Sequence, residues 1–189
     1  MGLPVLAMTL YLALGNPQAL LQPARSASGP QPTMTQVEAM VSQMTQALEA
    51  RAQAGAAQPE DAAAWAMAAR TLASLQRFKE ADQAFVRALA LTPDDAGLLA
   101  DRADILSLLQ GQDPRGEPMH LIERALRIDP DHPKALALAG SAAFQRGDLA
   151  TAVTHWRRAL RQLPPESDFA RGLGQSLQQA MQSQAGGQA

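Results

Sequence analysis

Residues 137–164 read ALAGSAAFQRGDLATAVTHWRRALRQLP, and the fold follows from this stretch. Gly140 is a small residue in a helix-forming run, and two helices approach closely only where side chains are small. Trp156 is the large residue that fills the space beside such a crossing. Gly147 can adopt the positive φ that commonly ends a helix, and Pro164 prevents the second helix from continuing. The stretch therefore predicts a hairpin of two closely packed helices.

The same pattern recurs along the chain. Pro59, Pro93, Pro130 and Pro164 are separated by 34, 37 and 34 residues. A large apolar residue follows each of the first three prolines by six positions, and a small residue follows four positions later. Repeats of this period are typical of arrays of helical hairpins. The large residues are Trp65, Leu99 and Leu136, and the small ones are Ala69, Ala103 and Gly140.

The repeating unit resembles the tetratricopeptide repeat, with W-x2-[small]-[small], a later A-x3-[FW]-x2-A and a closing proline. The resemblance covers residues 60–164 and predicts an all-α tetratricopeptide-repeat solenoid. Its middle repeat departs from the pattern, because Pro118 stands where a small alanine is expected. Three extra residues in 109–118 predict a wider turn there. The three predicted repeats are about 60–93, 94–130 and 131–164.

Two further helices are expected beside the three repeats. Thr35 and Glu38 fit a capping box, and apolar residues follow at helical spacing, so we predict an N-terminal helix over about 35–53. After the last repeat the first-helix register returns, which predicts a capping helix over 166–182. A terminal unit of an array needs a solvated outer face, and we expect this helix to provide it. Residues 183–189 are predicted to be a frayed tail.

The first residues are far more apolar than the rest. Residues 3–14 read LPVLAMTLYLAL, which is shorter than the roughly 20 residues of a spanning helix, and no Lys or Arg precedes them as in a signal peptide. We expect 1–17 to be a membrane-associated hydrophobic segment, either the end of a longer transmembrane helix or a short uncleaved anchor. A short buried helix is the alternative. Residues 18–34, rich in Pro, Ser, Gly and Gln, predict a flexible linker ahead of a repeat domain over 35–182.

Composition excludes several classes of function. A net charge of −2 without a Lys/Arg run argues against nucleic-acid binding, and the absence of cysteine excludes disulfides, thiolate nucleophiles and cysteine-based metal sites. The histidines, His120, His132 and His155, lack metal-ligand spacing. Because His132 precedes Pro133 at an expected helix start, a capping role is favoured there. No catalytic arrangement stands out, so we predict neither an enzyme nor a cofactor.

Longer stretches carry a closer resemblance. The sequences GEP at 116–118 and DPDHPKALALAG at 129–140 resemble the periplasmic domain of the bacterial cytochrome c maturation family CcmI, also called CycH, to which NrfG is similar. This likeness spans about 37–180. The sequence YLALGNP at 11–17 also resembles the exit of that family's second transmembrane helix, which implies that a first transmembrane segment and loop are missing from this chain.

The family resemblance implies a chaperone role. Members of the family hold apocytochrome c, mainly through its C-terminal helix, and hand it to the haem lyase subunits that attach haem. It also implies attachment to the bacterial inner membrane with the repeat domain in the periplasm. The alternative is a tetratricopeptide-repeat adaptor that assembles another envelope complex. A clamp for a terminal carboxylate is disfavoured, because Ala66, Arg70 and Ala73 stand where Lys and Asn would be required.

The predicted binding residues lie on the first helices of the repeats, which line the concave surface of such arrays. Apolar residues there would accept an amphipathic client helix, and Arg70 would pair with a client carboxylate. Two alternatives stay open: Leu138 and Phe144 belong to the core, or Arg70 pairs with Asp101 or Asp104 of the next unit. The predicted site residues are Met67, Arg70, Ser74, Asp101, Asp104, Leu108, Leu138, Ser141, Phe144 and Gln145.

Overall fold

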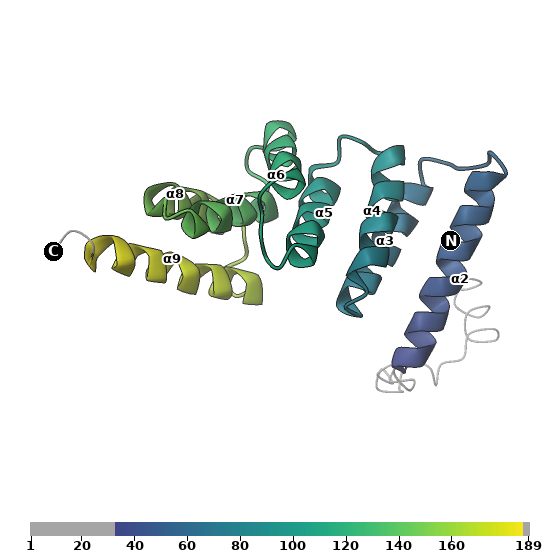
Figure 1. Cartoon of the computed structure of the whole chain (residues 1–189), viewed down its shortest axis with the longest axis horizontal. Coiled ribbons are helices and arrows are strands. Elements are labelled where there is room, and N and C mark those ends of the chain that lie inside the picture. The colour runs from purple at the N-terminus through teal and green to yellow at the C-terminus, as the bar shows by residue number, and fades with distance from the viewer. Residues whose placement is uncertain (1–32, 187–189) are drawn as a thin grey trace, which may run out of the picture. The chain divides into compact units, whose positions relative to one another are not determined.

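The structure is a computed structural model that describes residues 33–186 (Figure 1). This part of the chain is all-α, as the repeat pattern predicts. The segments predicted at 1–17 and 18–34 lie outside the described residues, apart from the last two positions of the second. The helices are α2 (Met34–Gln53), α3 (Asp61–Ser74), α4 (Phe78–Leu91), α5 (Ala96–Leu109), α6 (Glu117–Ile128), α7 (Pro133–Gln145), α8 (Leu149–Leu160) and α9 (Asp168–Gly186).

The capping box of α2 forms two residues earlier than the sequence analysis placed it. The backbone N–H of Thr33 donates to Oε1 of Gln36 at 2.8 Å, and the N–H of Gln36 donates to Oγ1 of Thr33 at 3.3 Å. The box predicted at Thr35 and Glu38 is therefore wrong, since both residues lie inside the helix. Both pairs have the required spacing, so the motif does not distinguish them.

The helices of the repeats pack as three hairpins, α3 with α4, α5 with α6 and α7 with α8 (Figure 1). Each hairpin packs on the next through α4 and α5, and through α6 and α7, and α9 packs on α8. The helix α9 ends later than expected, so residues 183–186, predicted as tail, are helical. Residues 187–189 lie outside the described part of the chain.

The crossing of α7 and α8 requires glycine. A Cβ added to Gly140 would lie 2.4 Å from ring atoms of Trp156, which no real contact allows. The indole Nε1 of Trp156 donates to the carbonyl oxygen of Ala137 at 3.0 Å, so the ring is fixed in this position. The first and middle hairpins carry Phe85 and Ile122 at the position of Trp156, and both are buried. The predicted close crossing is confirmed.

The turns within the hairpins differ in length as the sequence predicts. Residues 75–77 and 146–148 connect the helices of the first and third hairpins, whereas 110–116 connect those of the middle one. Gly147 has a φ of 78°, in the left-handed region that glycine tolerates. Pro118 lies buried in the first turn of α6, where its missing N–H is not needed for the helix. The wider middle turn is therefore confirmed.

Candidate helix-binding groove

A cavity of about 430 Å³ lies between α5, α7 and α9. Its walls combine apolar side chains with two serine hydroxyls and a few charged groups. We call it the inner groove, because it lies on the first helices of the repeats. Its lining residues are Asp104, Lys134, Ala137, Leu138, Ser141, Asp168, Phe169, Gly172, Leu173 and Ser176.

The inner groove exposes an aromatic side chain. Phe169, in the first turn of α9, is 45% exposed, while Leu138 is half-buried and Leu173 is buried. A phenyl ring left partly in water beside other apolar side chains can gain free energy by binding an apolar partner. The groove therefore has an apolar part with hydrophobic free energy available for binding.

An ion-pair network lies beside this apolar part and connects three first helices. Arg70 Nε on α3 lies 2.7 Å from Oδ2 of Asp101 on α5. Lys134 Nζ on α7 lies 2.8 Å from Oδ1 of Asp101 and 2.9 Å from Oδ2 of Asp104. The two cations and two carboxylates cancel. This confirms the alternative in which Arg70 pairs with the next unit.

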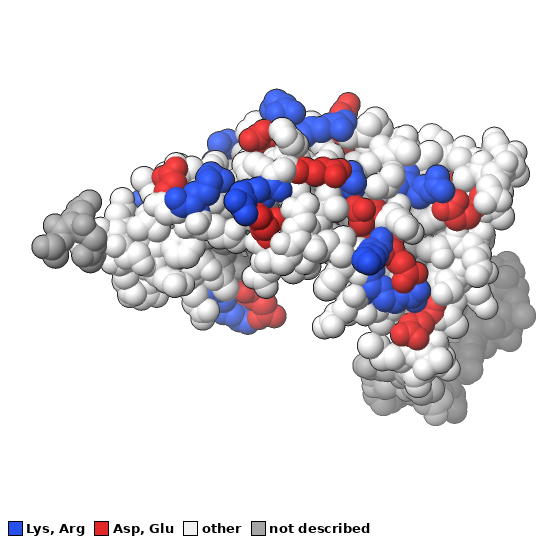
Figure 2. Space-filling model, in the orientation of Figure 1, with Lys and Arg blue, Asp and Glu red and all other residues white. Residues whose placement is uncertain are grey.

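The network keeps Lys134 protonated. Burial lowers the pKa of Lys134, but the carboxylates of Asp104 and Asp101 together outweigh that effect and raise the pKa above its ordinary value. Lys134 therefore remains an ammonium ion at neutral pH, and the carboxylates of Asp101 and Asp104 neutralise its charge within the protein. Elsewhere on the face seen in Figure 2, basic and acidic side chains also lie next to each other. No uniform basic stripe for a phosphate backbone is visible on that face.

The structure brings five of the ten predicted site residues to this place. Asp104, Leu138 and Ser141 line the inner groove. Arg70 and Asp101 are joined to it through the network. These five come from α3, α5 and α7, as the repeat register predicts.

Three other predicted residues lie outside the groove. Met67 on α3 is 63% exposed, and Leu108 near the end of α5 is 38% exposed. Ser74 donates its hydroxyl to the carbonyl oxygen of Thr71, within its own helix. They lie on first helices, but the described cavity does not reach them.

The last two predicted residues have other contacts. The ring of Phe144 packs on Trp156 with centroids 5.6 Å apart, and it belongs with the core of the third hairpin. Gln145 lines a separate cavity beside the turn 110–116 and donates its side-chain N–H to the carbonyl oxygen of Gln112 at 3.2 Å. The core alternative for Phe144 is therefore confirmed.

Seven lining residues of the groove were not among the ten predicted site residues: Lys134, Ala137, Asp168, Phe169, Gly172, Leu173 and Ser176. The signal for Phe169 was present: it stands 34 residues after Ala135, a buried position at the start of α7. This register places Phe169 at the start of a first helix, whereas the exposure of its ring depends on what lies beside α9. Reading the last helix only as a cap concealed this.

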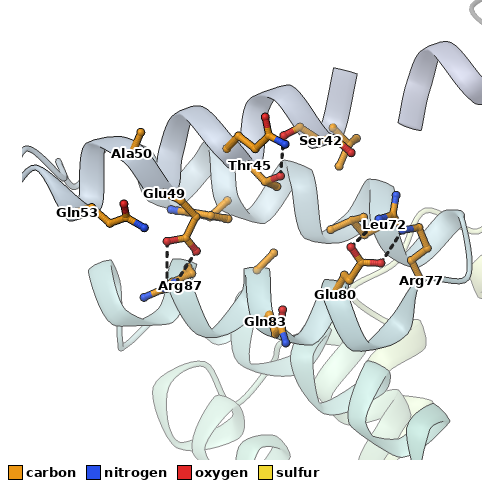
Figure 3. A pocket seen from close by; sticks show the side chains of 14 residues that line it. Ser42, Thr45, Glu49, Ala50, Gln53, Leu72, Arg77, Glu80, Gln83 and Arg87 are labelled. Carbon is orange, nitrogen blue, oxygen red and sulfur yellow. Dashed lines mark hydrogen bonds and ion pairs between the residues drawn. The ribbon is translucent and has the colours of Figure 1, made fainter. Parts of the chain in front are cut away.

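A second groove of about 430 Å³ lies between α2 and the α3–α4 hairpin (Figure 3). Ion pairs border it on two sides: Arg87 Nε lies 3.0 Å from Oε1 of Glu49, and Arg77 Nη2 lies 2.6 Å from Oε2 of Glu80. Trp65 forms part of its floor but is buried. This groove presents polar rims and no exposed aromatic ring, so it is a weaker site for an apolar helix.

One histidine of the described residues has a clear structural role. His132 caps α7, because its Nδ1 accepts the backbone N–H of Ala135 at 3.3 Å. The predicted capping role is confirmed. Between residues 33 and 186 no group of His, Asp and Glu side chains is arranged to hold a metal ion. None of the helices in that range combines the length and apolar character needed to cross a bilayer.

Comparison with protein families decides the assignment. A family described as the cytochrome c-type biogenesis protein H TPR domain matches residues 18–170. The chain belongs to this family. The matched domain is the tetratricopeptide-repeat domain of a family of c-type cytochrome biogenesis proteins.

The similar curated proteins are named cytochrome c-type biogenesis protein CycH. The one from Pseudomonas aeruginosa is 29% identical over 177 residues, covering 94% of this chain and 41% of the relative. The one from Bradyrhizobium diazoefficiens is 30% identical over 173 residues, covering 89% of this chain and 44% of the relative. The chain thus spans less than half the length of these relatives.

Solved structures support the fold. The first TPR of Spaghetti, bound to an HSP90 peptide, is 18% identical with a TM-score of 0.55, covering 68% of this chain and 96% of that one. The Yersinia enterocolitica translocator chaperone SycD is 15% identical with a TM-score of 0.54, and the match covers 64% of this chain and 83% of SycD. At these identities the likeness shows the fold alone, and it confirms the tetratricopeptide-repeat arrangement.

Proposed function

We propose that the inner groove binds the C-terminal helix of apocytochrome c and presents this client to the haem lyase. The half-exposed ring of Phe169 beside Leu138, at the mouth of an open cavity, carries the proposal. The family's role in cytochrome biogenesis supports the choice of client. In this proposal the domain works on the periplasmic side of the inner membrane and is tethered through residues 1–17.

An amphipathic helix suits the groove for two reasons. Apolar side chains at i, i+3 and i+4 would cover Phe169 and Leu138, and burying apolar surface contributes about 25 cal/mol per Å². The network of Arg70 and Lys134 with Asp101 and Asp104 pairs two cations with two carboxylates, so it leaves no net charge on the adjacent wall. A client helix with an apolar face therefore gains more from the groove than a strongly charged segment does.

The experiment is a titration of the chain with C-terminal peptides of c-type apocytochromes, with scrambled peptides as the reference. Gly172→Leu places a side chain in the inner groove, whereas Gly174→Leu places one elsewhere on α9. An added Cβ meets no heavy atom within 4 Å at either glycine, so both variants should fold. We expect Gly172→Leu to weaken peptide binding at least tenfold and Gly174→Leu to leave it unchanged.

Two outcomes would contradict the proposal. Binding of scrambled peptides as tightly as native ones would remove the specificity for cytochrome helices. Equal affinity of the Gly172→Leu variant and the unmodified chain would place the client outside the inner groove. Capture of folded envelope subunits without any affinity for helical peptides would instead support the adaptor function.

A further inference from the structure

Helix α9 carries the surface of a first helix, and no second helix of its own hairpin packs on it within residues 33–186. Gly174 in α9 stands 34 residues after Gly140 in α7, in the same repeat register. In α7 the indole of Trp156 covers Gly140 so closely that a Cβ would not fit. At Gly174 a Cβ would meet no heavy atom within 4 Å. The surface around this glycine is therefore covered in α7 and open in α9. We call the open surface around Gly174 the platform.

The open platform is apolar. A hollow of about 350 Å³ runs along this side of α9, where Leu177 is half-buried and Met181 is 43% exposed. This side of the capping helix is open to solvent, as predicted for a terminal unit, but part of the exposed surface is apolar. The lining residues, at helical spacing, are Gly174, Leu177, Gln178, Met181, Gln182 and Ala185.

The charge of this segment restricts the partner. Residues 172–189 contain no Asp, Glu, Lys or Arg. The guanidinium Nη2 of Arg157 on α8 approaches the thioether of Met181 at 3.6 Å, at the edge of the platform. Apart from Arg157 at this edge, the segment offers no charge to a partner, so a strongly charged helix face would lose hydration along α9 with little compensation. An uncharged face of small and apolar residues would pack on the platform without that cost.

We propose that this platform is a docking site for an amphipathic helix of another protein, which takes the place of a second helix and lays an aromatic side chain on Gly174. The α7–α8 hairpin shows the geometry that the docked helix would repeat. In the described residues Phe85 and Trp156, which lie in this register on second helices, are buried in their own hairpins, so neither is free to dock on a second copy of the chain.

The platform is separate from the inner groove. Phe169, Gly172 and Leu173 line the groove on one side of α9, whereas Gly174 and Met181 line the platform on another. A partner helix on the platform would therefore leave the groove open for a client. The two sites would let the domain hold a client and a further protein together.

The probe for the experiment is a labelled peptide of residues 147–164, which contains the α8 sequence and Trp156. The matched control peptide carries Trp156→Ala. Fluorescence anisotropy would measure binding of both peptides to the unmodified chain and to its Gly174→Leu and Gly172→Leu variants. A short peptide orders only on binding, so affinity in the micromolar range or weaker is expected.

The expected result is saturable binding that falls at least tenfold with Gly174→Leu or with the Trp156→Ala peptide, while Gly172→Leu leaves it unchanged. Equal binding by the Gly174→Leu variant would overturn the proposal. So would light scattering that shows the unmodified chain as a dimer which Gly174→Leu dissociates, because the platform would then be a self-association surface. If the platform proposal fails, the proposal that the inner groove binds the client still stands, since Gly172→Leu tests that site separately.

Discussion

The α7–α8 hairpin and the helix α9 carry a glycine at the same position of the repeat, but the glycine is covered in the hairpin and open in α9. In the hairpin, Trp156 rests on Gly140 and closes the surface, so glycine there is needed for packing. In α9 the equivalent Gly174 stays uncovered, and the apolar side chain of Met181 is exposed nearby. A residue that the repeat pattern requires for internal packing thus becomes available for binding in α9, where no helix of residues 33–186 covers it.

The largest expected effect comes from a substitution at the covered glycine of the α7–α8 hairpin. Gly140→Leu should lower the free energy of unfolding by about 3 kcal/mol, because the buried indole of Trp156 cannot move away from the new side chain. Gly174→Leu is the matched control and should gain up to about 1 kcal/mol, since leucine favours helix over glycine. Urea unfolding measures both. Equal stability of the two variants would show that the register is misassigned.

The second effect separates two phenylalanines. Phe144→Ala should lower the free energy of unfolding by about 2 kcal/mol, because the ring packs on Trp156 inside the closed hairpin. Phe169→Ala should change stability much less, because that ring lies partly in solvent on α9. Thermal unfolding of the two variants side by side provides the measurement. A larger loss for Phe169→Ala would mean that its ring belongs to the core.

The third effect concerns client binding. Phe169→Ala should weaken binding of an apocytochrome peptide about tenfold, which corresponds to about 1.4 kcal/mol, because an exposed aromatic anchor is removed from the inner groove. Met181→Ala, on the other side of α9, is the control and should leave client affinity unchanged. If Met181→Ala weakens binding of the client peptide more than Phe169→Ala does, the client occupies the platform instead.

The repeat pattern was sufficient to predict the fold, but it predicted the groove only in part. Proline spacing and small residues define the hairpins, because they encode close helix crossings that occur at a fixed period. The position of Phe169 could not be read in the same way, since its exposure depends on what lies beside α9 in space. Arg70 shows the same limit: its pattern allowed a client carboxylate or Asp101, and only the distance of 2.7 Å decides for Asp101.

A smaller effect tests the network. Arg70→Ala should lower the free energy of unfolding by less than about 1 kcal/mol, because the Arg70 side chain is more than half exposed and such pairs contribute little. Client affinity should change less than with Phe169→Ala, since the guanidinium is already paired. Urea unfolding and peptide titration of the same variant check both statements. A tenfold loss of affinity for the client peptide would show that Arg70 contacts the client directly.

The smallest expected effect is a pH dependence within the closed hairpin. Burial and then the charge of Arg158 lower the pKa of His155, although Asp148 opposes them. The unfolded chain then takes up a proton more readily, so stability is complete above the ordinary histidine pKa of about 6.5 and decreases as the pH falls through the lower folded value. His155→Gln should flatten the unfolding free energy between pH 7.5 and 5. An unchanged slope would exclude His155 as the source.

The most direct test of the inner groove uses the absence of cysteine in this chain. Ser141→Cys introduces a thiol in the groove wall, and Ser183→Cys introduces one on an exposed part of α9 that lines neither cavity. Alkylation rates would be measured with and without a saturating apocytochrome C-terminal peptide. The client site proposed here predicts strong protection at position 141 and none at 183. Bound peptide that protects neither thiol, or both equally, would contradict it.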